Sequence, residues 1–327
     1  INADAAVSGD NITPAIAIGP GGAPSVAWAE NGRQLRVKQW NGNAWTALAE
    51  DLRVDTNEQV FGIQIVPANG RLLVAWLETV NNVQGQGRMA MKRFGPGALT
   101  WPGGSVLPAQ TDVLALRLNS EAAGNALLLF VTFDASAAQL EGPLRLLREG
   151  IAGDWTDVCG PLGRPAAISA SFYPQTRNGF GVAKLAFPAS DPVAVFNNGD
   201  AVFARKCRGG NWSGLDGGAL GLVAAPPPGE SFWGLAVAQG EGYGVGLART
   251  KLARTNGNVV FVFDTQVLVE NGNSTGLEAR APALSQDNAG FHSGTLSLAS
   301  PRADSPLLAG VVSDGRPQAA RVFRYLP

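Results

Sequence analysis

The sequence predicts an all-β fold, a six-bladed β-propeller built from four-stranded antiparallel blades. Three observations lead to this prediction. A meander-like unit recurs along the chain, the second segment of each unit is continuously apolar, and 327 residues accommodate six units of about 54 residues. The 42 glycines and 21 prolines follow no collagen period, so they indicate turns between strands.

The clearest unit covers residues 12–48. Three apolar segments, at residues 15–18, 25–29 and 35–40, are separated by Gly-rich or Asn-Gly turns, and a fourth follows at 44–48. Asn41-Gly42 between two such segments is a strong hairpin signal. The unit is therefore predicted to be a four-stranded antiparallel meander.

The second-strand segment recurs in each later unit. It reads PSVAW at Pro24, LLVAW at Leu72, LLLFV at Leu127, GVAKL at Gly181, GVGLA at Gly244 and LLAGV at Leu307. These segments are apolar without alternation, which indicates strands buried on both faces. Inner strands sandwiched between neighbouring propeller blades have this burial.

The whole chain, residues 1–327, is predicted to be a single propeller domain. The blades are expected at residues 11–56, 57–110, 111–163, 164–229, 230–285, and 286–327 together with 1–10. The last unit contains only three strand segments, so residues 1–8 are expected to supply its outer strand. This closure removes an exposed sheet edge.

The pattern P-x-V-A-W followed by L-x-V-x-x-W-N-G-x-x-W, within residues 12–48, resembles the repeats of secreted bacterial β-propellers. These are similar to sialidase-like and lectin-like propellers. The resemblance implies a propeller fold and a secreted, periplasmic or cell-surface location. Sialidase-like propellers carry S-x-D-x-G-x-x-W at the outer hairpin. The corresponding segments NGNAW, GPGALTW, AGDW and GGNW lack that Ser and Asp, so sialidase activity is not expected.

Charge and composition exclude several classes of function. The net charge of −1 gives no basic excess for nucleic acid or for an anionic membrane. No apolar run approaches the roughly 20 residues of a transmembrane helix. The first residue is Ile1, which suggests a processed N-terminus such as signal removal leaves. Cys159 and Cys207 fall on adjacent blades and are predicted to form a disulfide.

No catalytic residue is assigned. The only histidine, His292, lies in a loop segment, so no Ser-His-Asp triad or zinc cluster is expected. A polar residue precedes the first strand of every unit. These residues are Asn11, Glu58, Asp112, Arg164, Glu230 and Asp287. Junctions of this kind gather around one mouth of a propeller channel. The carboxylates of Glu58, Asp112 and Glu230 would there suit calcium, but a wet channel mouth with polar loops is the favoured explanation.

Four loops between second and third strands are predicted to form the rest of this face, at residues 78–87, 134–142, 188–200 and 249–258. The loop 188–200 carries an aromatic ring beside amides and a carboxylate, a combination that suits sugar binding. These residues are Phe196, Asn197, Asn198 and Asp200. One tryptophan recurs at each of four outer hairpins: Trp45, Trp101, Trp155 and Trp212. We expect them to pack between blades, whereas a lectin would expose them.

The leading hypothesis from the sequence is a non-catalytic, extracytoplasmic propeller that docks a protein partner and needs no cofactor. The first alternative is a carbohydrate-binding, lectin-like propeller. The second is a metal-dependent hydrolase or lactonase that works at the channel mouth.

Overall fold

The computed structural model describes most residues from 14 to 161 and, beyond them, mainly the strands. The described ranges are 14–81, 83–95, 113–121, 124–133, 141–150, 153–161, 180–184, 192–197, 202–214, 222–224, 231–240, 243–255, 258–260, 264–270, 277–279, 284–285, 290–291, 297–299, 307–313 and 319–324. The chain divides into two compact units, Ile1–Val158 and Cys159–Pro327.

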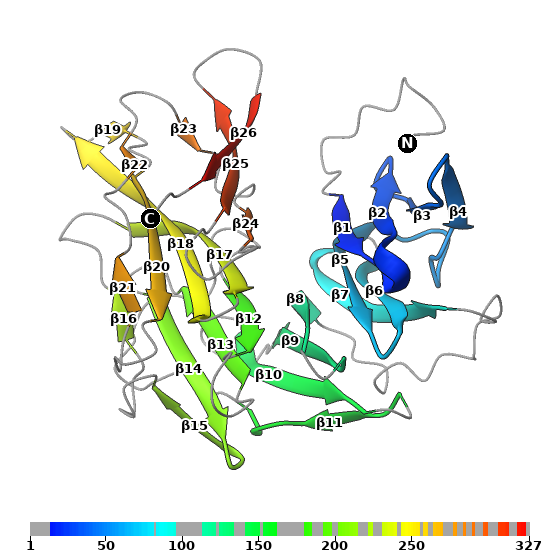
Figure 1. Cartoon of the computed structure of the whole chain (residues 1–327), viewed down its shortest axis with the longest axis horizontal. Coiled ribbons are helices and arrows are strands. Elements are labelled where there is room, and N and C mark those ends of the chain that lie inside the picture. The colour runs from blue at the N-terminus through cyan, green and yellow to red at the C-terminus, as the bar shows by residue number, and fades with distance from the viewer. Residues whose placement is uncertain are drawn as a thin grey trace. The chain divides into compact units, whose positions relative to one another are not determined.

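The first sheet is a four-stranded antiparallel meander, coloured blue in Figure 1. It consists of β1 (Ala15–Ile18), β2 (Pro24–Glu30), β3 (Gln34–Trp40) and β4 (Trp45–Ala49), hydrogen-bonded in that order. A 3-10 turn, Pro20–Gly22, joins β1 to β2. Asn31 and Gly32 turn β2 into β3 with φ values of 53° and 65°, the positive values that the two central residues of a type I′ turn require.

The second sheet contains two further meanders. The first is formed by β5 (Val60–Ala68), β6 (Arg71–Val80) and β7 (Val83–Phe94). The second is formed by β8 (Val113–Ser120), β9 (Ala126–Phe133), β10 (Glu141–Glu149) and β11 (Trp155–Asp157). One pairing, Gly87 with Val113, links them. A Cβ atom at Gly87 would lie 2.8 Å from the Phe61 ring, so only glycine fits this crossing.

The second compact unit contains three more antiparallel sheets. The first comprises β12 (Phe180–Lys184), β13 (Pro192–Asn197), β14 (Val202–Arg208) and β15 (Asn211–Gly214), with β16 (Leu222–Ala224) on β14. The next comprises β17 (Ser231–Gly240), β18 (Tyr243–Thr255), β20 (Asp264–Glu270) and β21 (Leu277–Ala279), with β19 (Asn258–Val260) and β22 (Leu284–Ser285) attached. The last comprises β23 (Gly290–Phe291), β24 (Ser297–Ala299), β25 (Leu307–Ser313) and β26 (Ala319–Arg324).

The prediction of an all-β fold with four-stranded antiparallel sheets is confirmed. The division into six blades stays a prediction. Residues 1–8, which were expected to close a ring, lie outside the described residues, so closure stays a prediction. No helix among the described residues is long and apolar enough to cross a membrane.

Four segments differ from the strand assignment that the sequence suggested. Residues 181–184 of the segment GVAKL lie in β12, the first strand of its sheet, and the second strand is β13. The predicted loop 188–200 therefore contains a strand, because Val193-Ala194-Val195-Phe196 is a β-branched and aromatic run. The predicted loops 78–87 and 249–258 are likewise mostly hairpin extensions of β6–β7 and β18–β19.

The core of the first compact unit consists of two hydrophobic clusters that share β6. Leu72, Val74 and Trp76 belong to one cluster, which also contains Leu35 of β3. Leu73, Ala75 and Leu77 belong to the other, with Phe130 of β9. Successive side chains of a strand point to opposite faces. The continuously apolar β6 is thus buried on both faces, as its sequence predicted.

Candidate functional site

The connection between β4 and β5, residues 50–59, is a polar loop of the first compact unit. Its backbone is tied to two strand pairs. The Leu52 amide donates to the Leu35 carbonyl at 3.0 Å, and the Val60 amide donates to the Gly32 carbonyl at 2.8 Å. On the other side, the Thr79 amide of β6 donates to the Gln59 carbonyl at 2.9 Å. The β4–β5 loop therefore bridges the β2–β3 turn and the end of β6.

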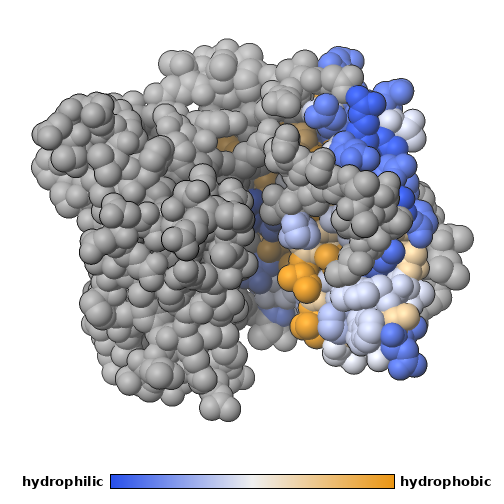
Figure 2. All heavy atoms as spheres, turned by 90° about the horizontal axis from the view of Figure 1, so that it is seen from above, coloured by the Kyte–Doolittle hydropathy of each residue, from blue (hydrophilic) through white to orange (hydrophobic). Residues whose placement is uncertain are grey.

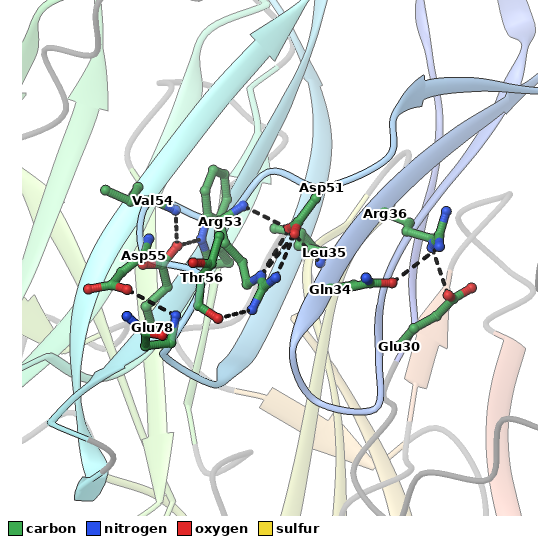
Figure 3. Close-up of polar contacts among 12 residues, drawn as sticks. Glu30, Gln34, Leu35, Arg36, Asp51, Arg53, Val54, Asp55, Thr56 and Glu78 are labelled. Atoms are coloured by element: carbon green, nitrogen blue, oxygen red, sulfur yellow. Dashed lines mark hydrogen bonds and ion pairs between the residues drawn. The ribbon is translucent and has the colours of Figure 1, made fainter.

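An ion pair inside the loop fixes its first half (Figure 3). The Asp51 carboxylate accepts from Arg53 Nη2 at 2.6 Å, and Arg53 Nη1 donates to the Thr56 carbonyl at 2.6 Å. Partial burial acts to raise the pKa of Asp51. The hydrogen bonds and positive charge of Arg53 outweigh that effect and hold the pKa below its ordinary value of 3.8. The bonds to Asp51 raise the pKa of Arg53, so both groups stay charged.

The second half of the β4–β5 loop is held by Glu78, at the end of β6. This carboxylate is fully buried and accepts hydrogen bonds from two successive loop amides, Val54 at 2.6 Å and Asp55 at 3.1 Å. It also accepts from Trp76 Nε1 at 2.9 Å and from Arg88 Nη2 at 2.8 Å. Four donors, one of them charged, offset the cost of burying the negative charge.

A similar arrangement occurs in the first sheet. Glu30 is buried at the end of β2, accepts from Trp28 Nε1 at 3.4 Å and pairs with Arg36 Nε at 2.7 Å. Arg36 also pairs with Glu50 at the start of the loop. The motif Trp-x-Glu thus occupies the same strand position in β2 and β6. The position of the arginine partner on the neighbouring strand differs between the two sheets. Arg36 lies opposite Trp28, whereas Arg88 lies opposite Glu78. The repeated VAW-x-Glu is visible in the sequence, but the arginine partners are not.

Glu58, expected at the channel mouth, is buried and lies at the turn between β6 and β7. Its carboxylate accepts from the Thr79 hydroxyl and from the Asn81 amide, the latter at 2.9 Å. Asn81 has a positive φ of 54°. The carboxylate of Glu58 therefore stabilises the β6–β7 turn, and each of its two oxygens accepts one of these hydrogen bonds.

The side chains that the β4–β5 loop leaves exposed are mostly polar. Thr56 and Asn57 are exposed, Asp55 is half-buried, and Val54 is 56% exposed. In the view of Figure 2, hydrophilic residues cover much of the coloured surface and hydrophobic residues form smaller groups. Within the described part of the chain, only Ile16, Ile18 and Val54 are large exposed hydrophobics. The loop offers hydroxyl, amide and carboxylate groups on a fixed backbone, which suits recognition of a polyhydroxylated ligand.

Other residues singled out from the sequence are placed only in part. Phe196 and Asn197 belong to β13, where they pair with Phe203 and Val202 of β14, so they are strand residues and not loop residues. The remaining ones lie outside the described residues: Asn11, Asp112, Arg164, Asn198, Asp200, Glu230, Asp287 and His292. In the portion of the chain that can be described, no three His, Cys, Asp or Glu side chains form a metal-binding group. A calcium site stays a prediction.

The recurrent tryptophans differ from one another. Trp155 packs against the cluster between β5–β7 and β8–β11, which is the inter-unit packing expected. Trp212 is half-buried, and its Nε1 donates to the Gly160 carbonyl at 3.1 Å. Trp45 pairs with Trp40 at the tip of the first outer hairpin, and Trp101 lies outside the described residues. Cys159 and Cys207 form a disulfide, with Cα atoms 5.8 Å apart.

No protein-family model and no curated protein sequence matches the chain. Solved structures with β-propeller-like glycoside hydrolase and lectin-like folds do resemble it. The GH93 α-L-arabinofuranosidase of Fusarium graminearum, in complex with arabinobiose, is 12% identical over 96% of this chain and 92% of its own, with a TM-score of 0.55. AofleA from Arthrobotrys oligospora is 13% identical over 97% and 84%, with a TM-score of 0.53. A protein of unknown function from Dyadobacter fermentans is 12% identical over 96% of this chain and 93% of its own, with a TM-score of 0.55.

These similarities cover nearly the whole chain and show that its fold is β-propeller-like. They also correct the leading functional hypothesis. The expectation of a non-catalytic propeller that docks a protein partner is wrong, because the proteins that share this fold include arabinofuranosidases. The sequence contained no catalytic motif, and the hypothesis gave that absence too much weight.

Proposed function

We propose that this protein recognises carbohydrate through a six-bladed β-propeller, at the face that carries the β4–β5 loop. The observation that carries the proposal is the full-length similarity to a propeller-like arabinofuranosidase bound to arabinobiose. The loop adds a chemical reason. Its exposed Thr56 and Asn57 and its half-buried Asp55 supply donors and acceptors for sugar hydroxyls, and the Asp51–Arg53 ion pair and the buried Glu78 carboxylate fix their backbone. Preorganised polar groups reduce the ordering cost of binding.

Glycoside hydrolysis is the second candidate function, and the same structural similarity favours it. Most glycosidases require two carboxyl groups on either side of the scissile bond. Glu58 and Glu78 are committed to backbone and side-chain donors, so they are poor candidates for that pair. Asp55 is the half-buried carboxylate of the loop and is the residue that we would replace first.

The proposed propeller is a closed ring, and the protein works outside the cytoplasm. Six units of this size, with residues 1–8 completing the last one, give a closed ring without an open edge. The Cys159–Cys207 disulfide favours an oxidising compartment, so we place the protein outside the cytoplasm.

The test is a panel of immobilised glycans, followed by calorimetric titration with arabinobiose and linear arabinan and by an assay with an aryl α-L-arabinofuranoside. We expect binding by the wild-type protein and at least a severalfold loss of affinity in the double variant Thr56→Ala/Asn57→Ala. Thr156→Ala, an exposed threonine of β11, is the matched control and should bind normally. Absence of wild-type binding across the panel would reject carbohydrate recognition. Turnover that Asp55→Asn abolishes would establish the hydrolase.

A further inference from the structure

We propose that the β3–β4 hairpin carries a second carbohydrate-binding site, formed by Trp40 and Trp45. This inference rests on the proposed function but concerns a different surface. The β4–β5 loop contacts the beginning of β3, through Leu35 and Arg36, whereas Trp40 ends that strand. The two sites would therefore lie at opposite ends of the same strand.

The two indoles form a cross-strand pair at the tip of the hairpin. Trp40 and Trp45 are register partners, with ring centroids 5.7 Å apart and planes tilted by 59°. Both side chains are half-buried, while the four residues between them, 41–44, are exposed. Part of the aromatic surface is thus accessible to a ligand that approaches the hairpin from solvent.

The hairpin holds this aromatic surface in one geometry. The Asn41 side chain accepts from the amides of Asn43 and Ala44, both at 2.9 Å, and donates to the Thr46 hydroxyl at 3.1 Å. The Asn41 amide also donates to the Ala44 carbonyl at 3.1 Å, and Gly42 adopts a φ of 101° that favours glycine. A sugar that docks here would need to order little of the backbone.

Comparison with the equivalent tryptophans distinguishes this hairpin. Trp155 packs against a hydrophobic cluster, and the Trp212 indole donates to the Gly160 carbonyl. Among the hydrogen bonds formed by described residues, none has the Nε1 of Trp40 or Trp45 as donor. The same sequence position therefore serves packing in one unit, a backbone contact in another, and an indole pair in the first.

The chemistry of the hairpin indicates a neutral saccharide. An indole offers a large apolar face together with one donor. The C–H face of a sugar ring can lie against that surface, while its hydroxyls meet the indole N–H. The exposed polar neighbours, Asn43 and Thr46, are uncharged. Lys38, the nearby cation, lies over Trp28, 5.8 Å from its ring centroid. An anionic sugar would find no charged partner among these contacts.

The experiment compares Trp45→Ala, Trp40→Ala and Trp45→Phe with Trp155→Phe, the control at the equivalent position of another unit. Arabinobiose and linear arabinan are titrated calorimetrically, and every titration is repeated in the Thr56→Ala/Asn57→Ala background. With that loop site weakened, the remaining binding should fall roughly tenfold or more in either alanine variant, the scale typical of a tryptophan anchor. Trp155→Phe should leave it unchanged.

A fluorescence measurement decides the matter if the alanine variants do not fold. The ligand should change the tryptophan emission of the wild type, and Trp45→Phe should lose much of that change. Arabinan binding that persists in all Trp40 and Trp45 variants would overturn this second site and leave the proposed function intact. A wild type that binds no carbohydrate would overturn both. Capture of a protein by the hairpin in the absence of any sugar effect would likewise reject it.

Discussion

Glu78 and Val54 are 24 residues apart in the chain, yet the Glu78 carboxylate accepts a hydrogen bond of 2.6 Å from the Val54 backbone amide. The adjacent Asp55 amide donates to the second oxygen of the same carboxylate. A strand end of one sheet thus sets the conformation of the loop that leaves the preceding sheet. We expect the conformation of this loop to depend on Glu78 more than on the loop's own residues.

Glu78→Gln should destabilise the protein by about 1–3 kcal/mol, the usual cost of leaving buried donors unsatisfied. Glutamine supplies one acceptor oxygen, so its NH₂ group would face one of the two donor pairs that Glu78 now satisfies. Hydrogen exchange at residues 50–59 should accelerate well beyond the global change.

Glu149→Gln provides the control for that experiment. Glu149 is also buried and paired with an arginine, Arg93, but it lies at the other end of the strands. Its replacement should cost a similar free energy of unfolding without selective exchange in the β4–β5 loop. Equal exchange of the loop in both variants would contradict the role of Glu78.

The Asp51–Arg53 pair predicts a specific dependence of stability on pH. The pKa of Asp51 is lowered in the folded protein, so the unfolded chain takes up the proton first as the pH falls. The contribution of Asp51 is therefore present above its ordinary value of 3.8 and is lost as the pH falls below it. Urea unfolding at pH 6 and at pH 3 should show a smaller acid loss for Asp51→Asn than for the wild type. An identical loss in both proteins would refute this assignment.

The disulfide should stabilise the second compact unit. Cys159 and Cys207 are separated by 48 residues, and closing a loop of this length restricts the unfolded chain by about 4 kcal/mol in the entropic account. Cys159→Ser/Cys207→Ser should lower the denaturation midpoint by a corresponding amount. Reductant should shift the midpoint of the wild type and leave the double variant unchanged; a wild type insensitive to reduction would contradict the prediction.

Ring closure gives a further prediction. Removal of residues 1–8 should lower the melting temperature and promote aggregation, because the edge of β26 would lose its expected partner. A longer truncation that removes every residue before Ala15 should lower the melting temperature further and also promote aggregation. Light scattering and thermal melts measure both consequences. A melting temperature unchanged by the eight-residue deletion would reject closure by this segment.

The sequence predicted much of the fold because strand burial leaves a pattern. The VAW segments of β2 and β6 and the Asn-Gly turns identified the meanders, and each has a local physical cause. The site was harder to predict. Glu58 was chosen for its position before a first strand, whereas its partners, Thr79 and Asn81, come from the following hairpin. The strand β13 was missed because Pro192 begins it, and proline is a turn signal in most contexts.

The two-sided burial of β6 makes its alignment unusually unforgiving. Neighbouring side chains, such as Ala75 and Trp76, enter different hydrophobic clusters, one of which must accommodate a small group where the other accommodates an indole. A shift of one residue would send each set into the space built for the other. Insertions of a single residue in this strand should consequently be tolerated far less than insertions of two residues. Repeats of this kind can diverge in their loops while the spacing within the strand stays fixed.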